Sequence, residues 1–421
     1  MKCILKSIVI IFLMLFFSCT NDEIALENNK TISDSTLKQQ IGNSPLLYSQ
    51  SELIIQYKHG TPDTTKNMLR RFYSVFSYET CHRCPDRNIE KWFFGGNIDI
   101  EPKKQAIEDG DDIPGIYSNA ILDVDYEFTF SLDMDSSYMG TDIDFSYESY
   151  IKPYNNGITI AVLDTGIDTN LPLFKDGITP SKFLYKAPDY EEGLSGWDFV
   201  NTDHNSYDDN LGKHGTIVTS IIVRRLKSLG INHQILPLKV CDNNGETKYF
   251  GLVCALNDAL NKADIVQMSL GWYDDGFGDF TNTIFSNLLN EHSDVMVVAS
   301  AGNSNNNNDS TFHYPSSYKH NNIIAVAATN SDFSGVAWFS NYGANNVDYY
   351  APGEDILFEG YNVDGTSFAA PVVAAEIAKI INFDPYASPD SIINQLNLSA
   401  IDCPLSFFEG KPTKYNKVIN P

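Results

Sequence analysis

Three side chains in this sequence have the chemistry of a nucleophile, of a base that activates it and of an acid that orients the base. Ser367 stands in GTSFAAP at the start of an apolar helical segment, where unpaired backbone N–H groups and the positive end of the helix dipole stabilise an anion. His214 begins another apolar segment within GKHGT, and Asp164 ends the apolar run of AVLDTGID. Each residue taken singly is typical of a helix cap or a turn. Together they indicate a serine that passes its proton to an imidazole held by a carboxylate.

Short apolar runs alternate with helical segments after residue 157. The strand-like runs are ITIAVLD, QILPLKV, DIVQMSL, DVMVVAS and NIIAVAAT, and the helical ones include IVTSIIVRRL and VCALNDALNKA. Runs without internal alternation are typical of strands buried on both faces, so this order predicts an α/β fold with a parallel sheet covered by helices. Ligands bind beyond the carboxyl ends of such strands, which is where Asp164, Ser269 and the pair Gly302-Asn303 stand.

The motifs around these residues resemble the subtilisin-like serine peptidases, or subtilases. DTGID, HGT and GTSFAAP stand in that family's order of Asp, His and Ser, and GWDFVNTD, LKVCDNNG, IVQMSLGW and VVASAGN extend the likeness over residues 155–395. The resemblance implies a subtilisin-like parallel sheet and a serine endopeptidase that hydrolyses peptide bonds through an acyl-enzyme intermediate. It implies that Ser367 is the nucleophile, His214 the general base and Asp164 the partner of the base. Asn303, in AGN, matches the side chain of the family's oxyanion hole.

The resemblance also implies how a polypeptide substrate binds. Two segments, Ser269-Leu270-Gly271 and Ser300-Ala301-Gly302, match those that flank the family's primary specificity pocket and pair with an extended peptide strand. The preferred substrate side chain stays open. No organic cofactor is expected, and no metal ligands are predicted; structural calcium is common in the family but matches no particular residues of this chain.

Two positions near His214 depart from the family pattern. The family usually has glycine before this histidine and a second histidine after HGT, where this chain has Lys213 and Ile217. The fixed charge of Lys213 predicts that protonation of His214 becomes harder. Two alternatives to a broad endopeptidase stay open: a catalytically silent subtilase that binds peptides, and a maturation protease for one precursor peptide.

The overall charge argues against nucleic acid as a partner. The chain carries 54 acidic and 29 basic residues, for a formal charge of −25. Such a charge repels nucleic acid and anionic membrane surfaces. The excess is concentrated in residues 97–150, whose carboxylates in DGDD, DVDYE and TDID lack the glycine-centred loop of a calcium site. We interpret them as part of a solvated acidic connector.

The N-terminal residues are typical of an exported bacterial lipoprotein. Two lysines precede the apolar residues 8–17, which are too few to span a bilayer, and FFSC then ends at Cys19. A small residue and a cysteine after such a core resemble a lipoprotein signal. We therefore predict that residues 1–18 are removed, that Cys19 is lipidated and that the protein is anchored to a membrane of the bacterial cell envelope. An ordinary signal peptide is the alternative. The polar residues 19–50 are interpreted as a flexible tether.

Residues 51–121 are predicted to form a small α/β domain. ELIIQY and IEKWFF are strand-like, and helices are expected after Pro62 and in EPKKQAIED. In position and size the domain resembles a subtilase propeptide, which would assist folding and block the cleft until it is cut away. A permanently attached accessory domain is the alternative. The remaining boundaries are an acidic connector over residues 122–154, the peptidase domain over residues 155–395 and a tail over residues 396–421.

The cysteines outside the signal form no regular framework. They are Cys81, Cys84, Cys241, Cys254 and Cys403. Cys81-His-Arg-Cys84 has the spacing of a zinc knuckle, but no second pair lies at a matching distance. A local disulfide or two free thiols is the interpretation that we favour.

Overall fold

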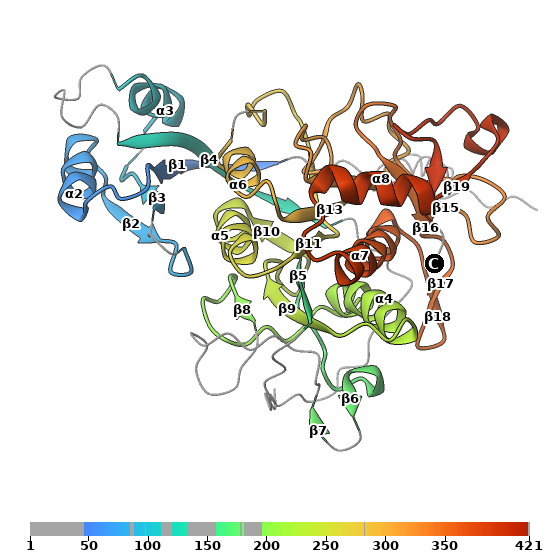
Figure 1. Cartoon of the computed structure of the whole chain (residues 1–421). Helices are drawn as coiled ribbons and strands as arrows, with labels where there is room; N and C mark the ends of the chain where they lie inside the picture. Colours follow the sequence, from blue (N-terminus) through green and yellow to red (C-terminus); the bar gives the residue numbers. More distant parts are fainter. Residues whose placement is uncertain are drawn as a thin grey trace, which may run out of the picture. The chain divides into compact units, whose positions relative to one another are not determined.

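A computed structural model describes residues 46–84, 88–96, 98–110, 120–132, 157–176, 179–180, 196–281 and 283–419. All of them belong to one compact unit, Gln40–Pro421. In it an N-terminal module, residues 46–132, precedes a C-terminal module, residues 157–419 (Figure 1). The predicted signal peptide, the lipidation site Cys19 and most of the predicted tether and connector lie outside the described residues.

The C-terminal module is built on a nine-stranded sheet in the order β19-β20-β16-β15-β13-β11-β5-β9-β8. Its neighbouring strands run parallel except β19 and β20, which are antiparallel. The central strands are β5 (Ile158–Asp164), β9 (His233–Lys239), β11 (Ile265–Met268), β13 (Met296–Ser300) and β15 (Ile323–Thr329), and the outer ones are β8 (Trp197–Asp198), β16 (Tyr349–Pro352), β19 (Ile401–Asp402) and β20 (Lys417–Val418). The five central strands consist entirely of buried residues. The predicted parallel α/β fold is confirmed.

Helices cover both faces of this sheet, as Figure 1 shows. On one face lie α4 (His214–Ser228), α7 (Thr366–Phe383) and α8 (Pro389–Ser399), and on the other lie α5 (Tyr249–Leu260) and α6 (Ile284–Glu291). Alternate residues of β5 supply the two cores: Ile160 and Val162 pack toward α4 and α7, whereas Ala161 and Leu163 pack toward α5. Among the described residues, α7 is the helix that is long and apolar enough to cross a membrane, but most of it is buried in this core.

Shorter elements complete the C-terminal module. Three two-stranded pairs are β6 (Lys175–Asp176) with β7 (Thr179–Pro180), β12 (Trp272–Tyr273) with β14 (His313–Tyr314), and β17 (Ile356–Phe358) with β18 (Tyr361–Val363). Single helical turns are η1 (Pro172–Phe174) and η3 (Leu405–Phe408). The pairing of β12 with β14 brings together the segments that precede and follow α6.

The N-terminal module contains an antiparallel sheet that continues into the C-terminal module. Its elements are β1 (Leu47–Tyr57), α2 (Asp63–Phe72), β2 (Ser77–Thr80), β3 (Ile89–Phe93), α3 (Ile100–Asp109) and β4 (Ile121–Ser131). The strand order is β10-β4-β1-β3-β2, in which β10 (Glu246–Lys248) comes from the C-terminal module. The two strands and two helices expected within residues 51–121 are confirmed, whereas β2 and β4 were not predicted.

Strand β4 occupies residues that the sequence analysis placed in a solvated acidic connector, and this part of the interpretation is wrong. Asp125 and Glu127 are buried, at 6% and 4% exposure. Asp125 accepts hydrogen bonds from the Tyr249 hydroxyl (2.9 Å) and from the backbone N–H of Ile284 (3.0 Å), at the start of α6. Glu127 accepts one from the N–H of Phe250 in the first turn of α5 (3.4 Å). The carboxylates are tolerated because they meet helix N-termini, whose N–H groups lack partners within the helix.

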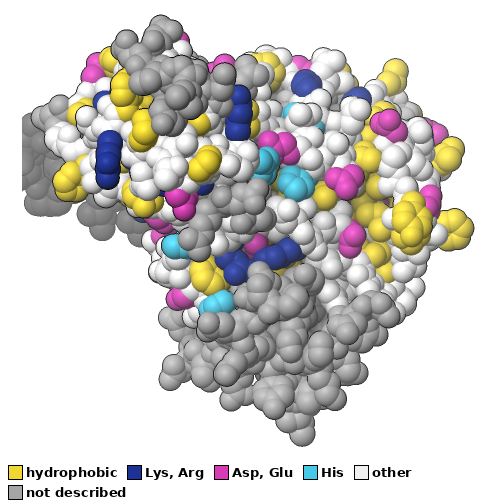
Figure 2. All heavy atoms as spheres, turned by 60° about the vertical axis from the view of Figure 1, so that its left-hand side comes forward, with side chains coloured by type: hydrophobic (Ala, Val, Ile, Leu, Met, Phe, Trp, Pro, Cys, Tyr) yellow, Lys and Arg dark blue, Asp and Glu magenta, His cyan; other side chains and the backbone are white. Residues whose placement is uncertain are grey.

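Basic side chains are dispersed over the face that Figure 2 shows. On that face Lys and Arg side chains lie in small groups between acidic and uncharged ones. The described residues of this face therefore form no continuous basic surface of the kind that tracks a phosphate backbone.

Candidate active site

Asp164 and His214 meet at the carboxyl end of the central strand. Asp164 is the last residue of β5, is fully buried and accepts a hydrogen bond from the backbone N–H of Thr165 (2.7 Å). His214 is the first residue of α4, and its Nδ1 lies 2.7 Å from Asp164 Oδ1. The next residue must be small, because a Cβ atom on Gly215 would lie 2.4 Å from the carbonyl oxygen of Gly166. Glycine at this position therefore lets α4 begin directly against the end of β5.

The charges around His214 favour its protonated form. Burial by itself would lower the pKa of His214, but the carboxylates of Asp164 and Asp208 outweigh burial and raise the pKa. The predicted depression by Lys213 is wrong, because the pKa of His214 is raised; the Lys213 ammonium donates instead to the Tyr207 hydroxyl (2.9 Å) and to the backbone oxygen of Asp208 (2.6 Å). An imidazole with a raised pKa accepts a proton readily, as a general base must.

Ser367 lies in the first turn of α7, and its backbone is joined to the end of β11 by reciprocal hydrogen bonds. The Ser367 hydroxyl donates to the backbone oxygen of Ser269 (3.2 Å), and the Ser269 hydroxyl donates to the backbone oxygen of Ser367 (2.6 Å). Gln267 donates to the same Ser269 hydroxyl (2.9 Å). These contacts hold the first turn of α7 against the sheet.

The hydrogen bond between Ser367 and His214 is not formed in this state. His214 Nε2 is buried and has no hydrogen-bond partner among the described residues, while the hydroxyl of Ser367 is engaged with Ser269. The ring of His214 lies beside that of Phe368, with 5.6 Å between ring centroids, so the imidazole adjoins the turn that carries Ser367. Catalytic hydrogen bonds are often long or misaligned until a substrate is bound.

The amide of Asn303 is held in one orientation by Thr366. Its Oδ1 accepts hydrogen bonds from the backbone N–H of Thr366 (2.9 Å) and from the Thr366 hydroxyl (2.8 Å). That hydroxyl in turn accepts from the N–H of Gly302 (3.1 Å). Both donors occupy Oδ1, so the Nδ2 group is the part of this amide that can donate to a ligand in the cleft beside Ser367, which Asn303 lines.

The two segments predicted to flank a specificity pocket do line one cleft with Ser367. Lining residues from these segments are Ser269, Leu270, Gly271, Ser300 and Gly302, and Asn303 and Thr366 line the same cleft. Ala301 departs from the prediction, because its fully buried side chain packs into a separate core with Ala327 and Val347. Among the described residues the remaining space in the cleft is about 40 Å³.

His313 fills part of the cleft and was not predicted from the sequence. A Cβ atom on Gly271 would lie 2.4 Å from His313 Cε1, and one on Gly302 would lie 3.2 Å from His313 Cδ2, so the imidazole lies between the two walls. Its Nδ1 is 2.9 Å from the hydroxyl of Ser316, and the ring packs edge-on against Tyr273 at 4.9 Å. Burial lowers the pKa of His313 to about 3, which keeps the ring neutral. Pairing of β12 with β14 brings it there, which no local sequence signal indicates.

The end of the N-terminal module enters the same cleft. Phe130, Ser131 and Leu132 line it together with Ser367. Strand β4 pairs antiparallel with β10, and the N–H of Leu132 then donates to the backbone oxygen of Gly245 (2.9 Å). Ser367 is only 5% exposed. An extended segment of the chain itself therefore lines the cleft that holds the candidate nucleophile.

The chain resembles a known family and several known proteins. The model of the Subtilase family (Peptidase_S8) matches residues 155–416, which include Asp164, His214 and Ser367. The chain belongs to the subtilase family. It is thus a subtilisin-like serine protease, and the fold and family that the sequence motifs implied are confirmed.

Relatives of this subtilase span most of its length. It is 27% identical over 385 residues to the Thermophilic serine proteinase of Bacillus sp. (strain AK1), covering 86% of this chain and 84% of that protein. It is 29% identical over 272 residues to Subtilisin E of Bacillus subtilis (strain 168), covering 61% of this chain and 64% of that protein. The crystal structure of a cold adapted subtilisin-like serine proteinase has the same fold, with a TM-score of 0.50 at 23% identity over 68% of this chain and 96% of that one.

Proposed function

We propose that this subtilase is an endopeptidase in which Ser367 attacks the peptide carbonyl, His214 accepts the serine proton and Asp164 holds and stabilises the imidazolium. The observation that carries the proposal is the 2.7 Å contact of His214 Nδ1 with the buried Asp164 carboxylate, which leaves Nε2 as the atom that can accept a proton. The hydroxyl of Ser367 leaves the Ser269 carbonyl oxygen and turns to Nε2 when the substrate is bound. His214 then returns the proton to the leaving amine, and water releases the acyl group by the same route.

Hydrogen-bond donors must stabilise the negative charge that develops on the attacked carbonyl oxygen. The Nδ2 group of Asn303 and the backbone N–H of Ser367, in the first turn of α7, are suited to this task. No cofactor takes part in these steps. The substrate is a polypeptide that lies extended between the two lining segments and β10.

Replacing Ser367 with Ala is expected to abolish two properties of the wild-type protein. Wild type should cut its own chain and then react with one equivalent of a fluorophosphonate probe, because the probe needs an activated serine. Intact-mass analysis should show fragments and the probe adduct for wild type, and one uncut, unlabelled chain for Ser367→Ala. Equal melting temperatures would exclude misfolding as the cause. A folded wild type that stays both uncut and unlabelled would instead favour a catalytically silent, peptide-binding subtilase.

We propose further that the N-terminal module is an inhibitory propeptide. Its strand β4 leads into the cleft as a substrate strand would, and Leu132, just after this strand, lines the cleft together with Ser367. The cut that activates the enzyme accordingly falls just beyond Leu132, so the mature chain begins within a few residues of it. The same intact-mass measurement gives this position.

The release of the module is expected to depend on pH. Burial raises the pKa of Glu127 to about 7, although Lys91 opposes it, and burial also raises that of Asp125. In the bound module these carboxyls keep their protons at a higher pH than in the free module, where they lose them above the ordinary carboxyl pKa. Raising the pH through 7 therefore weakens the binding of the module to the enzyme. Inhibition by the cut module should be about 10²-fold weaker at pH 8 than at pH 5. Glu127→Gln should flatten this dependence, whereas Glu79→Gln, at a more exposed carboxylate, should not. Equal inhibition at both pH values would contradict the assignment.

The substrate residue before the cut bond is proposed to be small, because the ring of His313 fills the pocket. His313→Ala should raise the ratio of kcat/KM for a Phe substrate to that for an Ala substrate by about 100-fold, since each added methylene in an apolar pocket is worth about 10-fold or more. The ratio should not change with pH above about 5, because His313 stays neutral. His320→Gly, outside the residues that line the cleft, is the control. An unchanged ratio for His313→Ala would show that another group limits the pocket.

We propose that the protein is exported and held on a bacterial envelope membrane through lipidated Cys19. The support comes from the charged, apolar and cysteine-ended N-terminal residues alone. A mass increase on Cys19 in membrane fractions, lost in Cys19→Ala, tests it.

A further inference from the structure

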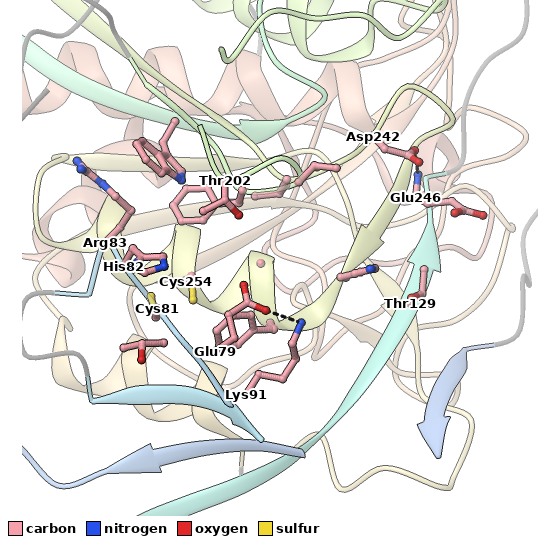
Figure 3. A pocket seen from close by; sticks show the side chains of 18 residues that line it. Glu79, Cys81, His82, Arg83, Lys91, Thr129, Thr202, Asp242, Glu246 and Cys254 are labelled. Carbon is pink, nitrogen blue, oxygen red and sulfur yellow. Dashed lines mark hydrogen bonds and ion pairs between the residues drawn. The ribbon is translucent and has the colours of Figure 1, made fainter. Parts of the chain in front are cut away.

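A cavity of about 250 Å³ lies between the two modules, away from Ser367. Its walls include the segment after β2, which carries Cys81, His82 and Arg83, and the helix α5, which carries Cys254. Figure 3 shows the sulfur atoms of Cys81 and Cys254 next to each other at one end of this cavity. None of these side chains has a part in the proposed hydrolysis.

Three cysteines gather at this end. Cys81 and Cys84 form a disulfide, with 5.5 Å between their Cα atoms, and Cys254 is a free thiol. The three sulfur atoms lie within 4.8 Å of one another, although Cys254 belongs to the C-terminal module. All three residues are at most 3% exposed. A free thiol is thus buried within reach of a disulfide on the other module.

The loop that carries the disulfide is held on α5. Arg83 Nε lies 3.7 Å from Asp258 Oδ1, one helical turn after Cys254, and the guanidinium lies 5.1 Å from the centre of the Trp197 ring. These contacts place an ion pair and a cation–π contact directly beside the sulfur atoms. They keep the disulfide facing Cys254 rather than solvent.

We propose that Cys254 and the Cys81–Cys84 disulfide form an exchange site that can join the two modules covalently. The thiolate of Cys254 attacks one sulfur of the disulfide, a new bond forms between modules, and the other cysteine leaves as a thiolate that takes up the proton lost by Cys254. One disulfide and one thiol exist before and after, so the step needs no oxidant or reductant.

Burial of the Cys254 thiol slows this exchange. It raises the pKa of the Cys254 thiol well above its usual range, with Glu79 adding to the effect and Lys91 opposing it. The thiol is therefore neutral in the closed state, which slows the exchange because the thiolate is the attacking form.

The link has a consequence that rests on the proposed function. A bridge from Cys254 to Cys81 or Cys84 would keep the cut propeptide beside the cleft at a high effective concentration. Inhibition would then persist after the connector is cut, and an external thiol that reduces the bridge would release the enzyme.

The trapping experiment uses full-length Ser367→Ala protein, so that its outcome does not depend on self-cleavage. Adding Cys84→Ser leaves Cys81 opposite Cys254. After mild oxidation with glutathione disulfide, blocking with N-ethylmaleimide and pepsin digestion at acid pH, mass spectrometry should show the peptides of Cys81 and Cys254 linked in most molecules. Cys241→Ser, at the other buried thiol, should leave the link intact, and Cys254→Ser should remove it. Separate labelling of Cys81 and Cys254, or zinc bound stoichiometrically in the native mass, would overturn the proposal.

The exchange itself is measured in Ser367→Ala protein that retains all three cysteines. During hours at pH 8 without oxidant, a linked peptide containing Cys254 should accumulate while the number of free thiols stays constant. A permanent Cys81–Cys84 pair, with Cys254 labelled alone at every time, would overturn it. In the wild type, fragments that separate on a denaturing gel only after reduction would support the covalent link between the modules. Failure to cut the chain would count against the proposed function instead.

Discussion

Asp164→Asn is expected to lower kcat by about 10⁴-fold without unfolding the protein, the loss known for the same change in a chymotrypsin-type triad. An asparagine amide can present N–H to His214 Nδ1, which would hold the imidazole in the tautomer whose Nε2 already carries a proton. The position is fully buried, so the neutral side chain fits at least as well as the charged one. Stopped-flow and steady-state kinetics on a peptide ester and a peptide amide would measure the loss.

The same variant should shift the acid limb of the pH–rate profile. Asp164 raises the pKa of His214, so removing its charge lowers that pKa, and the limb should move toward lower pH. In the Ser367→Ala background the change should cause no further loss, because the three residues act as a unit. Asp198→Asn is the matched control: this buried carboxylate caps the turn at Val200 and Asn201 outside the cleft and should affect stability alone. A loss below tenfold, or an acid limb that stays in place, would contradict the role of Asp164.

Asn303→Leu is expected to lower kcat by about 10²–10³-fold with little change in KM, the range known for the oxyanion-hole amide of subtilisin. The effect falls on kcat because the Nδ2 group meets full negative charge only in the transition state. Steady-state kinetics with one peptide substrate measure both constants.

The loss of kcat in Thr366→Val can be compared with the loss in Asn303→Leu. It removes the hydroxyl that donates to Asn303 Oδ1 but keeps the backbone N–H that donates to the same atom, so the loss should be smaller than for Asn303→Leu. Asn308→Leu, in a buried amide that donates to Ala301, should instead lower the melting temperature. A raised KM with unchanged kcat in the Asn303→Leu variant would mean that Asn303 binds substrate rather than the transition state.

Local patterns in the sequence were sufficient for the five central strands of the main sheet, but not for its outer strands β8, β16, β19 and β20. Strands β5, β9, β11, β13 and β15 were predicted because a strand covered by helices on both faces needs apolar residues at every position. The helices α4 and α7 follow from long apolar segments that begin at glycine-rich motifs. Their boundaries depend mainly on neighbouring residues, which is why sequence reasoning reaches them.

Strand β4 was not predicted, because the residues that stabilise it lie far from it in the sequence. Its carboxylates alternate with apolar residues, which is typical of a solvated segment or an edge strand when the sequence is considered alone. In the structure β10 pairs with the strand, and the N-termini of α5 and α6 satisfy Asp125 and Glu127. The contact between the modules therefore buries these side chains.

The sequence by itself determined the family, the parallel sheet and the roles proposed for Asp164, His214, Ser367 and Asn303, because each belongs to a short motif whose residue types carry the information. Only the tertiary structure decided that His313 narrows the cleft, that Lys213 turns to Tyr207 and Asp208 rather than to His214, and that Cys254 lies beside the Cys81–Cys84 disulfide. Each of these depends on a contact between segments distant in the chain, whose geometry is set by how strands pair and helices pack and not by any local pattern.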